Sequence, residues 1–293
     1  MKSSKQSNSF LRDKRILILG GAGSIGSALA RYIARFKPQR LVILDQDETG
    51  LFEVYEDIKS VCNADFVIDS IKDYDALQQA FFSVSPHLVF HVAAYKHVVL
   101  MERYPEEAVK TNVEGTKNAI NAAINTGVQK FIFISSDKAV YPVSVMGNTK
   151  LEGEEMCLNA NGKTKFIVVR FGNVMPSQGS VIPIWNKQIS ENRPLTVTHP
   201  KMKRFFMGIY EAVNLILQAA RLGKGGEIFI LDMGKQIFIE DLAKMMIRIS
   251  GKDLGIAYTK PGLGEKFKER LMTRDEGSRA KKTGNLYVIP SRR

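Results

Sequence analysis

Cysteine and histidine are scarce in this sequence, and their spacing excludes two kinds of site. Among 293 residues there are two cysteines, Cys62 and Cys157, and four histidines. The cysteines have no redox or metal spacing, and the histidines form no pair on a helix of the kind that binds zinc. The sequence therefore predicts no disulfide and no metal centre.

Long apolar runs are also missing. No run approaches the roughly 18 residues that a membrane-spanning helix needs, and residues 1–15 lack the apolar core of a signal peptide. The composition, 44% hydrophobic and 25% charged, is typical of a globular protein that can bury a large core. We therefore expect a cytoplasmic protein without a membrane span.

Negative charge is in the minority. The chain has 42 Lys and Arg against 30 Asp and Glu, a formal net charge of +12. The basic residues are spread along the chain, denser only in residues 2–15 and 260–293, and no nucleic-acid recognition motif accompanies them. We expect no nucleic-acid partner, whereas a diphosphate ligand would profit from the same positive field.

Short apolar runs alternate with helical segments along the first 170 residues. A long helical region at 105–127 has proline at its start and glycine at its end. Alternation of this kind predicts an α/β fold with a doubly wound, Rossmann-like parallel sheet. The runs that predict buried strands are 15–19, 41–44, 66–68, 88–92, 131–134 and 166–170.

The regular alternation weakens after residue 172, where Gly, Pro, Ser and Asn become frequent. We interpret residues 14–172 as a dinucleotide-binding Rossmann domain and residues 173–293 mainly as a smaller C-terminal substrate lobe. The apolar run 228–231 and a helix at about 240–250 belong to that lobe or return to the sheet.

A glycine-rich turn, Gly20-Gly-Ala-Gly-Ser-Ile-Gly26, joins the first strand to a predicted helix at 27–35. In dinucleotide-binding folds such glycines give a tight turn and let the backbone approach a pyrophosphate at the helix N-terminus. The strand before it and the helix after it are the context that this motif requires. We expect the cofactor to contact Gly20, Gly23, Ser24, Ile25 and Gly26.

An acidic residue, Asp45, ends the second strand nineteen residues after Gly26. A carboxylate at this spacing binds the adenosine ribose hydroxyls and repels a 2′-phosphate, which predicts NAD in preference to NADP. The alternative is that Asp45 only caps the helix predicted at 47–57. Further expected cofactor contacts are Asp69 and Ser70 after the third strand, and the small residues Ala93 and Ala94 after the fourth.

The chemistry is expected in residues 131–150. The apolar run 131–134 ends in Ser135, Ser136, Asp137 and Lys138, and Lys150 begins a helix that runs through Met156. Ligands of open α/β sheets bind outside the carboxyl ends of the strands, so these polar groups are placed to touch a substrate. The alternative is a turn with a helix cap and solvated lysines.

Seven motifs in this order resemble a known family over about residues 14–290: 20–26, 90–97, 110–116, 135–140, 145–150, 170–174 and 204–207. The chain resembles an extended short-chain dehydrogenase/reductase of the polysaccharide-biosynthesis branch, similar to soluble UDP-N-acetylglucosamine 4,6-dehydratases. The general family motif is Tyr-x-x-x-Lys, and Met146 stands where the tyrosine should be. A subgroup of these dehydratases shares that methionine, which cannot relay a proton.

The resemblance implies roles for individual residues. Ser136 would bond the substrate C4 hydroxyl, Lys150 would hold the nicotinamide ribose, and Asp137 with Lys138 would run the elimination, beside Met146 in the catalytic tyrosine's place. The expected substrate contacts are Asn173 and Arg204 at the diphosphate, Glu265 at the uridine ribose, and Lys96 and His97, which are equally interpretable as structural residues.

The function expected from this resemblance is an NAD-dependent lyase that oxidises C4, eliminates water across C5–C6 and returns hydride to C6. As the C5 base, Lys138 would need a pKa lowered by nearby cations and desolvation, and Asp137 would serve as the acid. Two alternatives stay open: a UDP-sugar 4-epimerase of the same branch, and a non-catalytic dinucleotide sensor.

A homo-oligomer is also expected, since relatives usually pair through the helices at about 105–127 and 147–160. Both segments carry more apolar residues than one buried face needs. A light-scattering mass near that of one chain, 32.8 kDa, would contradict this expectation.

Overall fold

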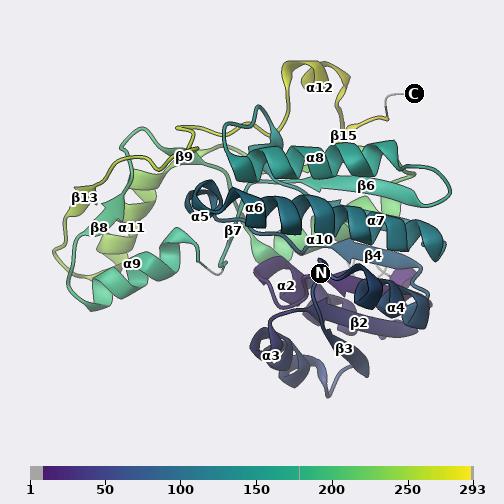
Figure 1. Cartoon of the computed structure of the whole chain (residues 1–293). Helices are drawn as coiled ribbons and strands as arrows, with labels where there is room; N and C mark the ends of the chain where they lie inside the picture. Colours follow the sequence, from purple (N-terminus) through teal and green to yellow (C-terminus); the bar gives the residue numbers. More distant parts are fainter. Residues whose placement is uncertain (1–8, 178, 292–293) are drawn as a thin grey trace.

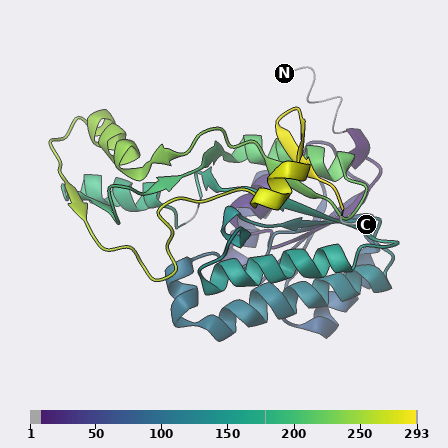
Figure 2. The ribbon, with the colours of Figure 1, turned by 90° about the horizontal axis from the view of Figure 1, so that it is seen from above.

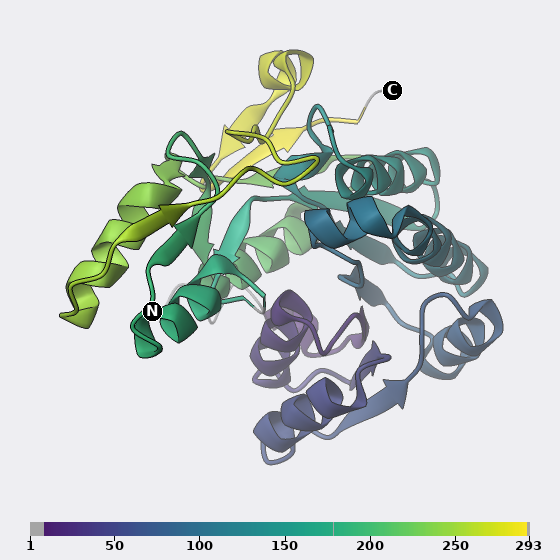
Figure 3. The same cartoon turned by 60° about the vertical axis from the view of Figure 1, so that its left-hand side comes forward.

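A computed structural model describes residues 9–177 and 179–291 of the chain. A large sheet with helices on both faces forms the main body, and a smaller lobe stands to one side of it (Figures 1 and 3). A short 3-10 turn, η1 (Ser9–Leu11), precedes the first strand. Nothing among these described residues forms a helix long and apolar enough to cross a membrane.

The sheet has nine strands in the order β14-β15-β11-β6-β5-β4-β1-β2-β3. The chain moves outward from β1 to β3 and then crosses back to β4, so the strand order reverses between β1 and β4, as in a doubly wound fold. The predicted fold class is confirmed. Seven strands are parallel: β1 (Arg15–Leu19), β2 (Arg40–Asp45), β3 (Ala64–Ile68), β4 (Leu88–His91), β5 (Lys130–Ile134), β6 (Lys165–Arg170) and β11 (Ile228–Leu231); β15 (Leu286–Ile289) and β14 (Lys281–Thr283) close one edge in antiparallel pairing.

Both faces of the sheet are buried, which explains why the strands are continuous apolar runs. In β1, Ile16 and Ile18 belong to one hydrophobic core, while Leu17 and Leu19 belong to the other. Alternate side chains of a strand point to opposite faces, so each strand supplies both cores. The first core includes side chains of α2 (Ser24–Ala34), α3 (Glu48–Ile58) and α10 (Ile209–Leu222), and the second those of α4 (Tyr74–Val84), α7 (Gly115–Asn125) and α8 (Val145–Asn159).

The helical region expected at 105–127 has a wide turn inside it. A π-helical segment, η2 (Val109–Glu114), lies between α6 (Pro105–Ala108) and α7, and α5 (Val98–Arg103) precedes them. Within η2, Asn112 accepts the backbone N–H of Tyr95 at 2.8 Å and donates to the backbone oxygen of Tyr95 at 3.0 Å. The wide turn therefore fixes the loop that follows β4.

Two helices begin earlier than the sequence predicts. Helix α2 begins at Ser24, so Gly26 lies inside it. Helix α8 begins at Val145, because the Ser144 side chain caps it by accepting the N–H of Gly147 at 3.1 Å. Lys150 therefore lies in the second turn of α8, and the expectation that it begins the helix is wrong.

The smaller lobe has its own core around Trp185, which is fully buried. Strands β11, β14 and β15 join the large sheet instead, and the division of the chain at residue 172 stays a prediction. Strand β7 (Asn173–Met175) pairs with β10 (Phe206–Gly208) where the chain enters and leaves the lobe. The lobe contains α9 (Val181–Ser190), β8 (Leu195–Val197), β13 (Ile256–Tyr258), α11 (Ile239–Ser250) and the pair β9 (Lys203–Arg204) with β12 (Ile237–Phe238).

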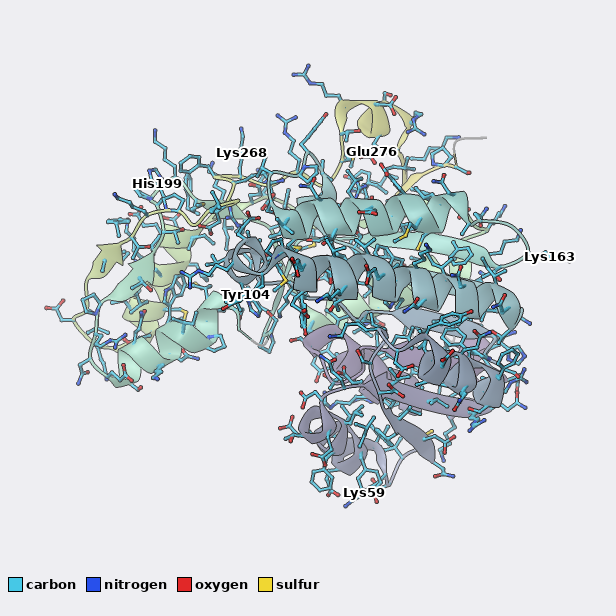
Figure 4. The ribbon with its side chains drawn as sticks, in the orientation of Figure 1. Lys59, Tyr104, Lys163, His199, Lys268 and Glu276 are labelled. Atoms are coloured by element: carbon cyan, nitrogen blue, oxygen red, sulfur yellow. The ribbon has the colours of Figure 1, made fainter. Side chains whose placement is uncertain are left out.

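A buried ion network ties the end of the chain to the sheet. The Arg170 guanidinium, at the end of β6, pairs with Glu154 of α8 at 2.5 Å and with Glu276 of α12 (Arg274–Arg279) at 3.0 Å. It also donates to the backbone oxygen of Leu271 at 3.1 Å. Figure 4 shows Glu276 on α12, which lies above α8 in this view. Three distant parts of the chain are held by one side chain that is 2% exposed.

Replacing Arg170 with leucine should destabilise the fold strongly, because it leaves the Glu154 and Glu276 carboxylates without their buried counter-ion. We expect a loss of about 3–5 kcal/mol in the free energy of unfolding, measured by urea denaturation. The matched control is Arg31→Leu, which removes an exposed pair with Asp57 and should cost less than about 1 kcal/mol. Equal losses for the two variants would contradict the role given to the network.

Candidate active site

A cavity of about 640 Å³ lies where the parallel strands end and the smaller lobe begins. Its wall comes from the turn after β1, the residues that follow β2 to β6, and the near side of the lobe. Of the expected site residues only Gly26 and Asp137 do not line it. The others do: Gly20, Gly23, Ser24, Ile25, Asp45, Asp69, Ser70, Ala93, Ala94, Lys96, His97, Ser136, Lys138, Met146, Lys150, Asn173, Arg204 and Glu265.

The glycines of the first turn are glycine for different physical reasons. Gly20 has φ +84°, and a Cβ on it would lie 2.4 Å from the Ala93 nitrogen; a Cβ on Gly26 would lie 1.9 Å from the Gly20 oxygen. Both are required by the close packing of the turn. Gly23 would meet only the Gly20 oxygen at 3.7 Å, and its φ of −67° suits any residue. A side chain there would fill cavity space at the N-terminus of α2, so the residue fits an open cradle for a phosphate group.

Asp45 is oriented by two backbone donors. Its carboxylate accepts the N–H of Ala22 at 2.9 Å and the N–H of Asp47 at 3.1 Å. The N-cap of α3 is Asp47, whose side chain accepts the N–H of Gly50. The alternative in which Asp45 caps this helix is therefore wrong, and its carboxylate stands at the cavity wall beside the glycine turn.

A chain of polar contacts follows β5. Ser136 Oγ donates to Asp137 Oδ1 at 3.0 Å, and Lys138 Nζ donates to the same oxygen at 3.0 Å. Asp137, in the 3-10 turn η3 (Asp137–Ala139), is fully buried, and its Oδ2 has no hydrogen-bond partner among the described residues. Gly172 lines the cavity next to that oxygen, since a Cβ on it would lie 3.0 Å away. Asp137 therefore stands behind the wall and reaches the cavity through Ser136 and Lys138.

The environment of Lys138 differs from the one expected. Burial lowers its pKa, but the carboxylates of Asp137 and Glu269 raise it by more, while Arg204 opposes them; overall the pKa is raised. The expected lowering of this pKa is therefore wrong for the site as the structure has it. Asp137 raises this pKa most, and Glu269, whose Oε1 lies 3.7 Å from Lys138 Nζ, adds to the effect; the sequence did not point to Glu269.

Lys150, unlike Lys138, has a lowered pKa. Its side chain is 6% exposed, and burial lowers its pKa to about 8 against the opposing effect of Glu154. Its Nζ donates to the backbone oxygen of Ile134 at 2.6 Å and lies 4.3 Å from the ring centroid of Phe133. The amine is thus held beside the end of β5, at the cavity wall.

Met146 lies one turn before Lys150 on α8 and is 3% exposed. It packs in a small hydrophobic cluster with Met101 and Ala108, and Tyr95 packs against that cluster. Both Met146 and Tyr95 line the cavity. The tyrosine position of the general motif is therefore occupied by an apolar group in a well-packed place, which supplies shape and no proton.

Lys96 and His97 face the lobe. Burial lowers the pKa of both side chains, and the charge of Lys96 lowers that of His97 further. The His97 ring lies against Gly179, where a Cβ would be 2.5 Å from the ring. His97 therefore lies against the segment that leads into α9, and both residues line the cavity.

A clamp of opposite charges closes the lobe side. Arg204 is 7% exposed, and its Nη2 lies 3.4 Å from Glu265 Oε1. The same guanidinium donates to the backbone oxygen of Lys203 at 2.8 Å. Asn173, the first residue of β7, lines the same cavity. Arg204 and Asn173 could therefore meet an anionic ligand from this side.

Two residues that matter here were not expected from the sequence. Glu269 lies in the stretch between β13 and α12, which has no helix or strand and so no periodicity to read. Glu154 was placed in a helix but given no role, although Ser135 Oγ donates to it at 2.5 Å. No local pattern in the sequence marks Glu269, because its partner Lys138 lies far away along the chain.

The strand order, the glycine turn at the first strand and the Ser-Asp-Lys cluster beside a buried helical lysine define a Rossmann-type protein of the extended short-chain dehydrogenase/reductase class. The sequence matches the family described as "Polysaccharide biosynthesis protein" over residues 16–291. The chain belongs to this family, and the resemblance at that level is confirmed.

Relatives and a solved structure agree with this assignment. The chain is 44% identical to the probable polysaccharide biosynthesis protein EpsC of Bacillus subtilis over 91% of its own length but only 46% of that protein, so it spans about half of this relative. It is 38% identical to a protein named UDP-glucose 4-epimerase of Rickettsia bellii, covering 95% of this chain and 83% of that one. The structure of Pen from Bacillus thuringiensis superimposes with a TM-score of 0.92 at 39% identity, covering 97% of this chain and 90% of Pen.

Proposed function

We propose that this protein modifies a nucleotide sugar for surface polysaccharide or glycan precursor synthesis, as an NAD-dependent 4,6-dehydratase acting on UDP-N-acetylglucosamine. The single observation that carries the dehydratase assignment is the contact of Ser136 and Lys138 with one oxygen of Asp137 at the cavity wall. An elimination needs a base and an acid that face adjacent carbons, and this cluster supplies both.

The residues around the glycine turn fit a dinucleotide. Gly23 leaves the N-terminus of α2 uncovered, and Asp45 is oriented for ribose hydroxyls by the N–H groups of Ala22 and Asp47. Lys150 would hold the nicotinamide ribose, while Asp69, Ser70, Ala93 and Ala94 would complete the site. The chemistry that bound NAD supplies is reversible hydride transfer, first from sugar C4 and finally to C6.

The protein's own residues would move the protons. Ser136 passes the proton of the C4 hydroxyl to Asp137, to which it already donates a hydrogen bond. Lys138, in its neutral form, removes the proton from C5, which the C4 ketone has made acidic. Asp137 gives its proton to the C6 oxygen, which leaves as water, and Lys138 returns its proton to C5. Both side chains end the turnover as they began it.

A second function is favoured by one comparison. The Rickettsia relative is named a UDP-glucose 4-epimerase, and an epimerase would transfer hydride at C4 only. Such a reaction involves no proton transfer at C5 and no loss of water, so it gives Lys138 no task and uses Asp137 only for the C4 hydroxyl proton. For this reason the epimerase is the alternative and the dehydratase the proposal.

Liquid chromatography coupled to mass spectrometry, applied to UDP-N-acetylglucosamine after incubation with the protein, separates these functions. The dehydratase gives a product lighter by one water. An isomer of unchanged mass would replace the proposal with the epimerase, and unchanged substrate in the presence of NAD would contradict both. Unreacted sugar nucleotide incubated without protein is the control.

Replacing Asp45 with alanine should narrow the preference for NAD over NADP. In the unmodified protein a 2′-phosphate would face the Asp45 carboxylate, and two like charges about 4 Å apart cost roughly 1–4 kcal/mol, a factor of about five or more in affinity. Calorimetric titration of both nucleotides measures the ratio. Tighter binding of NADP than of NAD to the unmodified protein would refute the assignment.

The two lysines should fail at different steps. The Lys138→Ala variant should still oxidise C4, seen as a transient absorbance of reduced cofactor, but lose roughly 10²–10⁴-fold in water release and in exchange of the C5 hydrogen with solvent deuterium. The Lys150→Ala variant should do neither. Met146→Ala is the matched control from the same cavity wall and should cost much less, because its side chain carries no proton. Near-normal dehydration by Lys138→Ala would move the base to another residue, with His97 tested next.

A further inference from the structure

Glu269 is a buried carboxylate to which the proposed reaction gives no role. It is 3% exposed, although it lies in the stretch between β13 and α12 that has neither helix nor strand. This stretch crosses from the smaller lobe to the sheet (Figure 2), and its neighbour Lys268 lies exposed on the outer surface (Figure 4). The backbone oxygen of Glu269 accepts the Gln236 amide at 2.5 Å, so the residue is fixed in place.

The carboxylate lies between two lysines. Its Oε1 lies 3.7 Å from Lys138 Nζ, and its Oε2 lies 2.9 Å from Lys266 Nζ. Lys266 in turn donates to the backbone oxygen of Val140 at 2.9 Å, in the loop that follows Lys138. Glu269 and Lys266 therefore join the C-terminal stretch to both the side chain and the backbone of the proposed catalytic segment.

The charges that face Lys138 come from three parts of the chain. Asp137 precedes it, Glu269 approaches from the C-terminal stretch, and Arg204 faces it from β9. Two carboxylates and one guanidinium act on the amine, and Lys266 pairs with the other oxygen of Glu269. Burying a carboxylate is costly unless a cation pairs with it, so Glu269 favours the charged form of Lys138.

We propose that Glu269 is a positioning residue for Lys138, whose buried carboxylate holds the Lys138 amine as an ammonium ion directed at Asp137 and shares its charge with Lys266. This inference rests on the proposed function only for its consequence in catalysis. The base of the elimination must be neutral, so Glu269, together with Asp137, raises the pH above which Lys138 can act. Lys266 moderates that effect, because it competes for the same carboxylate.

The direct test needs no substrate. In protein labelled with ¹³C-lysine, the Lys138 signal is assigned by its loss in the Lys138→Arg variant and is followed by NMR as a function of pH. Removing a charge within 4 Å should shift a pKa by about one to three units. We expect Glu269→Gln to lower the pKa of Lys138 by about that amount. We expect Lys266→Gln to raise it, because Glu269 then acts on Lys138 alone.

The catalytic readout is the pH profile of C5 hydrogen exchange with UDP-N-acetylglucosamine. Its acidic limb, which reports the neutral form of Lys138, should move to lower pH in Glu269→Gln by the same amount as the NMR titration. A merely structural role would lower the rate at every pH and leave the limb in place. If the protein does not act on this substrate, the proposed function fails while the NMR titration still decides the role of Glu269.

Two variants serve as controls. Glu269→Asp keeps the charge and should restore at least half of the shift. Glu240→Gln removes a carboxylate that pairs with Lys244 on α11, outside the cavity wall, and should leave the Lys138 titration unchanged. The proposal is overturned if Glu269→Gln leaves the Lys138 pKa within a few tenths of a unit, or if Lys266→Gln lowers it. Because the two main variants act in opposite directions, failure of either one to fold leaves the other as a test.

Discussion

The buried Arg170 guanidinium is the contact on which the arrangement of the cavity wall depends. It satisfies Glu154 and Glu276 at once, and Glu154 also accepts the hydroxyl of Ser135, the residue before Ser136. A carboxylate buried without a cation would cost several kcal/mol, so the end of β5, the helix that carries Lys150 and the start of α12 are energetically tied together. The same guanidinium fixes Leu271, two residues after Glu269, which places the proposed positioning residue next to Lys138.

The C-terminal stretch is attached to the cavity mainly through charges. Glu265 meets Arg204, and Glu269 meets Lys138 and Lys266. Ion pairs of this kind fix a definite geometry and can be replaced by a ligand. An anionic group that enters the cavity offers Arg204 the same charge as the Glu265 carboxylate. Apolar packing could not respond in that way, because it has no charge for a ligand to replace. The proposed diphosphate clamp and the proposed setting of Lys138 thus belong to one stretch of chain.

Local patterns allowed most of the sheet and the cofactor side of the cavity to be predicted. Continuous apolar runs such as Phe131–Ile134 mark strands buried on both faces, and Gly20 and Gly26 mark a turn in which a Cβ would clash. Glu269 could not be predicted, because it meets Lys138 only after the chain returns across the sheet. The start of α8 was missed for a different reason: the cap is Ser144, while the sequence argument treated Lys150 as the beginning of the helix. A charge pair or a helix cap depends on which residue meets which in the fold, and the local sequence pattern does not contain that information.

Met146 leaves the site without a proton carrier at the position where the general family motif has a tyrosine. In the general family motif a tyrosine would stand there to carry protons, and Met146 packs against Met101 and Ala108 instead. Proton transfer then needs another route, and the chain from Ser136 to Asp137 to Lys138 is continuous at 3.0 Å for each contact. In the proposed reaction the C4 proton is taken by Asp137, and Lys138 must be neutral to remove the proton at C5, a form that Asp137 and Glu269 disfavour. In this proposal Ser136 and Asp137 therefore take over the tyrosine's task at C4, while the charges around Lys138 bear on the later C5 step.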